Sequence, residues 1–169
     1  MSEHLAERLA SFSTNLRFED IPSDLVGDIC LHALDTIGVC LASTPLPYAR
    51  TVSAFVRHEG GAGRSTAFGL TGSFPARNAA FYNASLGHGM DFDDSHLVAI
   101  SHPSSTILPA LLALAEENGC DGKAVVTALV AGIEVMTRVG VVCGAALKPT
   151  GEIARKARRG FSRDQSRDQ

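Results

Sequence analysis

Tryptophan is absent from this sequence of 169 residues, and aromatic residues make up only 6% of it. Hydrophobic residues nevertheless reach 45%, which is enough to build a sizeable core in one domain of ordinary size. Because that interior has to be built mainly from Ala, Leu and Val rather than from large rings, the composition favours closely packed helices.

Cysteine is also scarce, and none of the four cysteines stands in the Cys-x-x-Cys spacing of zinc and redox motifs. Cys30 and Cys40 fall inside apolar helical patterns. We therefore expect reduced thiols that serve as small core residues, as is usual in the cytosol.

We expect neither a secretory leader nor a membrane span in this sequence. Its first ten residues carry charged side chains and no long apolar run. The most apolar stretch, 124–143, contains Glu134 and Arg138, which are spaced as partners on one helix face. We expect a cytoplasmic protein (mitochondrial in a eukaryote is the alternative, without a clear transit peptide), and neither a membrane nor a nucleic acid as partner.

Positive charge is sparse except near the last residues of the sequence. The net charge is −3, but residues 1–147 hold 8 basic and 15 acidic side chains, a balance of −7, whereas residues 148–169 hold 7 and 3, a balance of +4. The last stretch also lacks apolar periodicity. We therefore predict one helical domain over 1–147 and a basic, polar, disordered tail over 148–169.

Helical periodicity dominates the rest of the chain and predicts an all-α fold. A short extended segment near 65–70 is the one exception that the pattern allows, and the glycine-rich stretch before it lacks the spacing of a phosphate-binding loop. The last helix is apolar nearly all round, which favours a buried, central position. The expected helices are 4–16, 23–43 with Ser23 as a candidate N-cap, 48–58, 75–87, 105–118 and 122–142.

The segment 88–109, HGMDFDDSHLVAISHPSSTILP, connects two of these helices and is chemically the richest part of the chain. It concentrates three of the 6 histidines and three of the 18 acidic residues. Loops held by rigid elements are a frequent position for catalytic groups. The groups that can carry a proton are His88, Asp91, Asp93, Asp94, His96 and His102.

A first interpretation of this segment is purely structural. Short polar side chains near helix ends commonly accept hydrogen bonds from free backbone N–H groups, without any catalysis. The side chains that could do so here are Asp94, Ser95, Ser101 and Ser104.

A second interpretation is a metal site, because carboxylates and histidines together can bind Zn, Mn or Fe. The spacing argues against it, since Asp91, Asp93 and Asp94 do not easily converge with both His96 and His102 from a single loop. Neither His-Glu-x-x-His nor an EF-hand pattern is present. On this basis we expect no metal and no other cofactor.

A third interpretation, which we favour, is acid–base chemistry on a small anionic molecule. Histidine titrates near neutral pH, and a neighbouring carboxylate can orient it and tune its pKa. In addition, the His-Pro-Ser turn before a helix would direct free backbone N–H groups, at the positive end of the helix dipole, toward a carboxylate of the substrate.

The stretches FYNASLGHGMDFDDSH, SHPSSTILPALLALAEENG and ALVAGIEVMTRVG, together with LAERLASF and ICLHALDTIGVCLAS near the N-terminus, resemble the MmgE/PrpD family. The resemblance covers about residues 5–147. It implies the N-terminal part of a large all-α domain, which family members combine with a smaller α+β domain. Members are typically homodimers and eliminate, decarboxylate or epimerise di- and tricarboxylic acids without a metal.

The resemblance also implies roles for particular residues. By motif, Asp91 and His102 would be catalytic, while Ser95, His96 and Ser104 would contact the substrate. The most similar activity would be that of a 2-methylcitrate dehydratase, a lyase of propionate catabolism. Cis-aconitate decarboxylase and iminodisuccinate epimerase are the alternatives within the family.

The chain departs from the family after the matched part. Members are more than twice as long and supply a second His, in an Arg-x-Phe-His-Pro-like segment, together with substrate-binding lysines. Here the sequence reads RGFS at 159–162 and continues into the basic tail, so we expect a truncated chain without the α+β domain. We therefore expect little or no activity from this truncated chain, and the alternative from a different functional class is a non-catalytic helical fragment.

Overall fold

The computed structural model describes residues 4–147, and these form the expected all-α fold. Six α-helices and one short 3-10 helix account for most of this part of the chain. Their bounds are α1 Leu5–Asn15, η1 Phe18–Asp20, α2 Ser23–Ser43, α3 Pro47–Glu59, α4 Ala76–His88, α5 Pro103–Asn118 and α6 Gly122–Leu147. The predicted tail, 148–169, lies outside the described residues.

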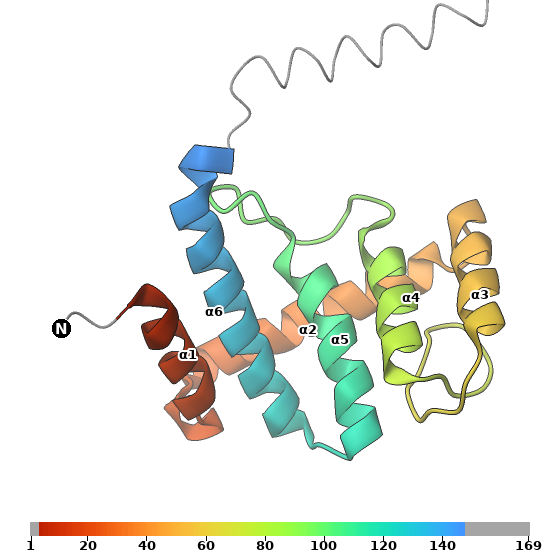
Figure 1. Ribbon diagram of the computed structural model, residues 1–169, viewed down its shortest axis with the longest axis horizontal. Helices are drawn as coiled ribbons and strands as arrows, with labels where there is room; N and C mark the ends of the chain where they lie inside the picture. Colours follow the sequence, from red (N-terminus) through yellow and green to blue (C-terminus); the bar gives the residue numbers. More distant parts are fainter. Residues whose placement is uncertain (1–3, 148–169) are drawn as a thin grey trace, which may run out of the picture.

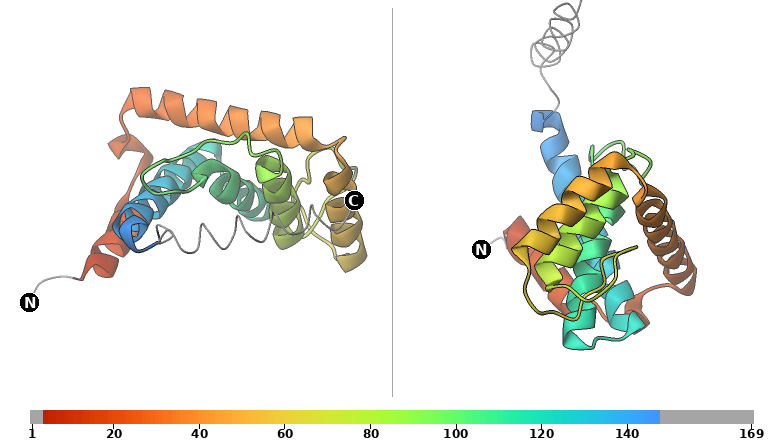
Figure 2. Two further views of the ribbon diagram at one scale, coloured as in Figure 1. Left: turned by 90° about the horizontal axis from the view of Figure 1, so that it is seen from above. Right: turned by 90° about the vertical axis from the view of Figure 1, so that its right-hand side faces the viewer.

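Five of the helices lie in a row, and the sixth crosses them. The row runs in the order α1, α6, α5, α4, α3, and α2 packs across α6, α5 and α4 (Figures 1 and 2). The long apolar helices α2, α5 and α6 meet at the centre, because small and aliphatic side chains of each helix pack against those of the other two.

Two hydrophobic clusters hold this arrangement together. One lies among α2, α3 and α4 around Tyr82 and Leu86, and the other lies among α2, α5 and α6 around Leu108 and Leu129. Burial of each of these large side chains contributes about 1.5–3 kcal/mol relative to exposure. The clusters fix the positions of α4 and α5, whose adjacent ends carry the polar segment 88–109.

The connection between α3 and α4 is only partly extended. Ser65 and Phe74 form an isolated antiparallel bridge. Residues 4–147 contain no β-strand longer than such a single bridge. The buried Asn83 side chain on α4 accepts a hydrogen bond from the Phe68 N–H and donates one to the Thr66 carbonyl. An amide side chain thus satisfies backbone groups that a second strand would otherwise pair.

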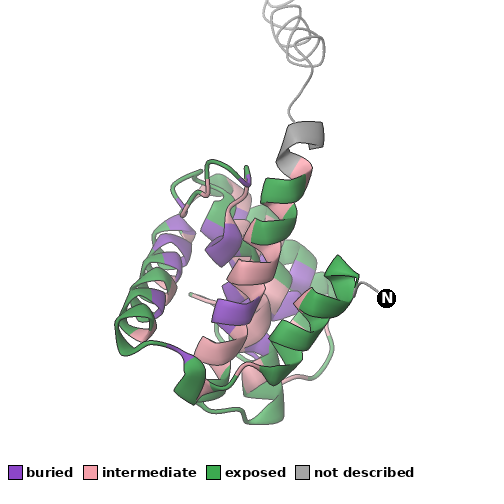
Figure 3. Cartoon of the chain, turned by 90° about the vertical axis from the view of Figure 1, so that its left-hand side faces the viewer, coloured by how far each residue is buried: buried purple, intermediate pink, exposed green. Residues whose placement is uncertain are grey.

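Three details of the sequence-based prediction need correction. Cys40 is buried, and burial raises the pKa of its thiol to about 11, but Cys30 is exposed on the outer side of α2 and is not a core residue. Pro22, and not Ser23, is the N-cap of α2. The apolar helix α6 is not enclosed, since Val141 and Val142 are exposed. Helix α1 is also exposed almost throughout (Figure 3).

Two helices are long and apolar enough to cross a membrane by length and composition alone. These are Ser23–Ser43, with a mean hydropathy of 1.6, and Gly122–Cys143, with a mean hydropathy of 1.8. The ion pair that the sequence suggested is present in the second, with Arg138 Nε 2.6 Å from Glu134 Oε2. The absence of a membrane partner stays a prediction.

Candidate acid–base site

The loop that follows α4 is held tightly at its first residues. His88 is the last residue of α4, and its carbonyl accepts the N–H of Asp91 at 2.9 Å. Gly89 lies against the ring of Tyr48, so closely that a Cβ at this position would overlap it. Asp91 adopts φ 53°, in the left-handed region that Asp tolerates better than most residues. The chain therefore turns back immediately after α4, toward the start of α5 (Figure 1).

Asp93 occupies the centre of the site. Its side chain is fully buried, and its carboxylate lies 3.1 Å from His88 Nδ1 and 3.4 Å from His102 Nδ1. The Ser105 hydroxyl, in the first turn of α5, donates a short hydrogen bond to the same carboxylate. One buried acid thus orients two imidazoles that come from two different helices.

The surroundings of Asp93 favour its ionised form. Burial alone would raise the pKa of this carboxyl, but hydrogen bonds from Ser105, from its own backbone and from His88, together with the charge of His102, outweigh that effect. The pKa of Asp93 therefore lies below its ordinary value. A carboxylate that stays charged can fix the tautomer of a neighbouring imidazole, as in other Asp–His pairs.

Asp91 joins this cluster from the solvent side. One donor atom from each of His88, Asp91, Asp93 and His102 can be chosen so that all four lie within 4.8 Å of one another. Asp91 and His102 hence lie on the same side of the domain, as the active-site hypothesis requires. Asp91 itself is exposed and His102 is 33% exposed, so both groups are accessible from solvent.

The neighbouring Asp94 has a different, structural role. Its carboxylate accepts the backbone N–H of Ser104 at 3.0 Å and the Ser104 hydroxyl at 2.6 Å, and so caps the N-terminus of α5. Ser104 is completely buried by these contacts. The prediction that Ser104 and the free helix end receive a substrate carboxylate is therefore not supported, because Asp94 already occupies that position.

His96 is also directed away from the cluster. Its backbone N–H pairs with the Ser101 carbonyl at 2.9 Å, and its Nδ1 accepts the N–H of Ala99 at 3.0 Å, which stabilises the turn between them. The ring lines a different cavity, shared with α1 and α6. The structure thus gives His96 a turn-stabilising contact rather than a place beside Asp91 and His102.

Ser95 remains close to the cluster. Its hydroxyl lies 3.3 Å from His102 Nδ1, and the side chain is exposed. His88 and His102 have ring centroids 4.8 Å apart. A molecule that approaches this surface would meet both imidazoles and the Ser95 hydroxyl together, which makes these groups the accessible part of the site.

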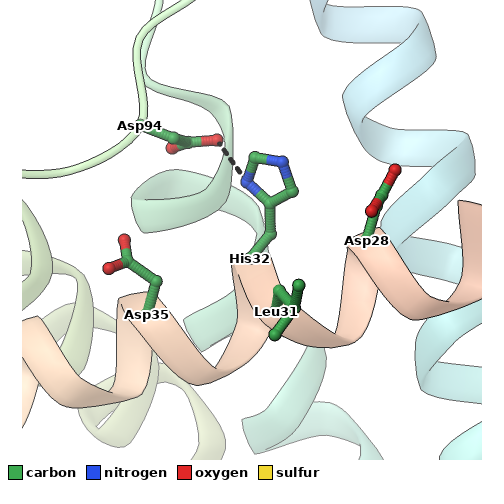
Figure 4. Close-up of a pocket in the computed structure, with 5 residues that line it drawn as sticks. All are labelled: Asp28, Leu31, His32, Asp35 and Asp94. Carbon is green, nitrogen blue, oxygen red and sulfur yellow. Dashed lines mark ion pairs between the residues drawn. The ribbon is translucent and has the colours of Figure 1, made fainter.

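A cavity of about 340 Å³ opens on the α2 side of the loop. Figure 4 shows its lining residues, with His32 Nδ1 3.5 Å from Asp94 Oδ2 and Asp28 on the other side of the His32 ring. The lining residues are Asp28, Leu31, His32, Asp35 and Asp94. Three carboxylates without a Lys or Arg do not suit an anionic substrate, so the cavity is a poor substrate site.

Comparison with known proteins decides the family. Residues 7–149 match the model of the MmgE/PrpD N-terminal domain, which is well over half of the chain. The chain belongs to the MmgE/PrpD family. Both the all-α architecture and the position of the DFDDSH segment between two helices agree with the resemblance noted above.

Two curated relatives carry the name of a cis-aconitate decarboxylase or of a protein like it. The cis-aconitate decarboxylase-like protein oryM of Aspergillus oryzae is 28% identical over 144 residues, which cover 81% of this chain and 30% of that protein. The cis-aconitate decarboxylase of Mus musculus is 29% identical over 117 residues, which cover 69% of this chain and 24% of that protein. The chain thus spans less than a third of the length of either relative.

The MmgE/PrpD pattern predicted roles for Asp91 and His102, which lie in the same cluster. It predicted none for Asp93, which contacts His102, or for Ser105, which contacts Asp93. The missed signal was the spacing of Ser105 three residues after His102, which places its hydroxyl in the first turn of the helix that His102 caps. His88 was noticed in the motif without a role, and the structure places it on Asp93.

Proposed function

We propose that this chain contributes the proton-transferring groups of a lyase-type enzyme that acts on a di- or tricarboxylic acid. The observation that carries the proposal is the pair of imidazoles, His88 and His102, on the single buried carboxylate of Asp93. Membership of the MmgE/PrpD family supports the reaction class, since curated relatives carry decarboxylase names.

The chemistry of this class needs groups beside the substrate that can accept or donate a proton. In a dehydration, a base removes a proton from carbon next to a carboxylate, the C–O bond breaks, and the departing hydroxide takes a proton and leaves as water. In a decarboxylation, the C–C bond to one carboxylate breaks, CO₂ leaves, and the electron pair on carbon takes up a proton. Two adjacent histidines can supply both functions.

The three acids to be tested follow from family and relatives. A 2-methylcitrate dehydratase-like activity is our first assignment, and the names of the two relatives add cis-aconitate decarboxylation. Iminodisuccinate epimerisation requires the same removal and return of a proton next to a carboxylate. A cytoplasmic location and a homodimeric assembly belong to this proposal as well.

A non-catalytic helical fragment is the second candidate, and one feature favours it. The segment 88–109 contains no Lys or Arg, and Asp94 fills the helix end that could have bound an anion. A di- or tricarboxylate needs several cationic donors within hydrogen-bond reach. Because loss of one preorganised donor costs about 10²–10³ in rate, we expect turnover by this chain to be very low.

Exchange of substrate hydrogen for solvent deuterium separates the two candidates, because it reports the proton-transfer step alone. The 169-residue chain, its His102→Ala variant and a His32→Ala control are incubated in D₂O with each acid and followed by NMR. Slow exchange that only His102→Ala abolishes is the expected result. Equal rates in all three proteins, or no exchange above the protein-free sample, would favour the non-catalytic fragment.

Complete turnover of any of the acids is measured in the same samples. We expect it to stay near the detection limit, for want of cationic donors in the segment. A robust rate that His102→Ala removes would show that this chain is a working enzyme by itself.

A further inference from the structure

The four side chains around Asp93 also form a donor set that metal ions bind. His88, Asp91, Asp93 and His102 are the only such group of three or more His, Cys, Asp or Glu residues among residues 4–147. Asp94 and His96, whose spacing in the sequence disfavoured a metal, lie outside this group, and His88 at the end of α4 belongs to it. We propose that these four residues bind one divalent late transition metal ion, of the class of Zn²⁺, Co²⁺ or Ni²⁺.

The donor distances are close to those of a coordination shell. Ligand atoms about 2.0–2.1 Å from a tetrahedral ion lie about 3.3 Å from one another. The separations to the Asp93 carboxylate are 3.1 Å from His88 Nδ1 and 3.4 Å from His102 Nδ1. The widest separation in the group, 4.8 Å, has to close, and the exposed side chains of His88 and Asp91 are the ones free to move.

The scaffold holds the inner ligands before any ion arrives. His88 ends α4 and His102 is the N-cap of α5, so two packed helices fix the separation of the two backbone positions that carry the imidazoles. The Ser105 hydroxyl donates to the Asp93 carboxylate and orients it. Hydrogen bonds of this kind, made to a ligand by a residue outside the coordination shell, orient metal-binding groups in many proteins.

Charge and donor chemistry select the class of ion. With both imidazoles neutral, the group carries the two negative charges of Asp91 and Asp93, and no Lys or Arg stands in 88–109 to neutralise them. A dication restores neutrality. Two nitrogen and two oxygen donors suit zinc and its neighbours in the periodic table better than Mg²⁺ or Ca²⁺, which prefer oxygen alone.

This inference is independent of the proposed function, although both concern the same side chains. An ion on the imidazole nitrogens would use the lone pairs that otherwise accept protons. Metal loading is therefore expected to suppress any proton exchange by the chain, and an inhibitory ion is the role that the geometry supports.

Cobalt is the probe, because four- and five-coordinate Co²⁺ absorbs visible light far more strongly than the hexa-aqua ion. The full 169-residue chain is stripped with a chelator and titrated with Co²⁺ at a pH above the ordinary histidine pKa of about 6.5. We expect a visible band that saturates at one ion per chain. Addition of Zn²⁺ should displace the cobalt and remove the band.

Variants connect the band to the four residues. His88→Ala, His102→Ala and Asp93→Asn should each weaken Co²⁺ binding by about tenfold or more. His32→Ala, which removes a histidine paired with Asp94 beside the same loop, should leave it unchanged. Far-UV circular dichroism checks each fold, and the exposed His88 keeps the test valid even if the buried Asp93→Asn change unfolds the protein.

Two outcomes would overturn the proposal. One is the absence of a saturable band up to millimolar Co²⁺ in the folded chain. The other is a band of equal strength and affinity in the wild type, His88→Ala and His102→Ala, because the ion would then bind elsewhere.

Discussion

At the scale of single residues, two adjacent aspartates have opposite roles. Asp93 is buried against two histidines and Ser105, whereas Asp94 turns to the other side of the chain and caps α5. One step in sequence thus separates a site residue from a capping residue. The DFDD motif alone could not assign these roles.

Asp93→Asn should lower stability at neutral pH and flatten the acid dependence of unfolding. The folded-state pKa of Asp93 is depressed, so its contribution is fully present above the ordinary carboxyl pKa of about 3.9 and is lost as pH falls from there through the folded value. The difference from wild type should be about 1–3 kcal/mol at pH 7 and shrink below about pH 4. Urea unfolding at a series of pH values measures it.

Asp91→Asn is the matched control for this prediction. Asp91 is exposed in the same loop, and Asn tolerates its φ of 53° as well as Asp does. The free energy of unfolding of Asp91→Asn should equal that of the wild type at each pH in the series. A difference between Asp93→Asn and wild type that grows on acidification would contradict the assigned direction.

At the scale of elements, the polar site depends on how α5 begins. Pro103 stands at its first position, where the missing N–H is harmless, and His102 is the N-cap without a capping side-chain bond. The carboxylate of Asp94, ten residues earlier in sequence, supplies the cap instead. The loop and the helix therefore fold as one unit, which places His102 beside Asp93.

Asp94→Ala should destabilise the contact between the loop and the first turn of α5. Loss of an N-cap costs about 0.5–2 kcal/mol, and here it also leaves the buried Ser104 hydroxyl without its acceptor. We expect a lower urea midpoint and faster amide hydrogen exchange at 103–106. Asp35→Ala, which removes another carboxylate from the lining of the same cavity, should have little effect.

If Asp94→Ala and Asp35→Ala lowered the urea midpoint equally, charge in the cavity, rather than the cap, would stabilise the loop. Faster exchange at the far end of α5 but not at 103–106 would equally contradict the capping role.

At the scale of the whole molecule, apolar helix faces remain uncovered in the described residues. Only 22% of the most apolar window of α2 and 17% of that of α6 is buried. Along α2, Leu31, Leu34 and Leu41 are 63%, 66% and 49% exposed. Exposed apolar surface of this extent typically marks a contact with another protein surface.

The purified chain is therefore expected to self-associate through α2. Leu31→Glu with Leu34→Glu should shift the molecular mass measured by light scattering toward that of one chain, because the double change places two charges on the exposed face. Asp35→Glu, on the same helix, is the control and should leave the mass unchanged. A monomeric wild type at high concentration would refute the expectation.

The sequence by itself determined the class of fold and pointed to the segment that holds the candidate site. Apolar periodicity is a local property, so six helices and their approximate bounds could be predicted, as could a loop rich in carboxylates and histidines between two of them. Family membership likewise followed from linear motifs around that loop.

Only the tertiary structure decided which of these groups meet. Whether His88 reaches Asp93, whether Asp94 fills the helix end and whether Cys30 is covered depend on the packing of α2, α4 and α5. These contacts join residues that a local pattern cannot relate, because the separation of two helix ends is set by the side chains between the helices. The site is therefore a product of helix packing, which brings the last residue of one helix to the cap of another.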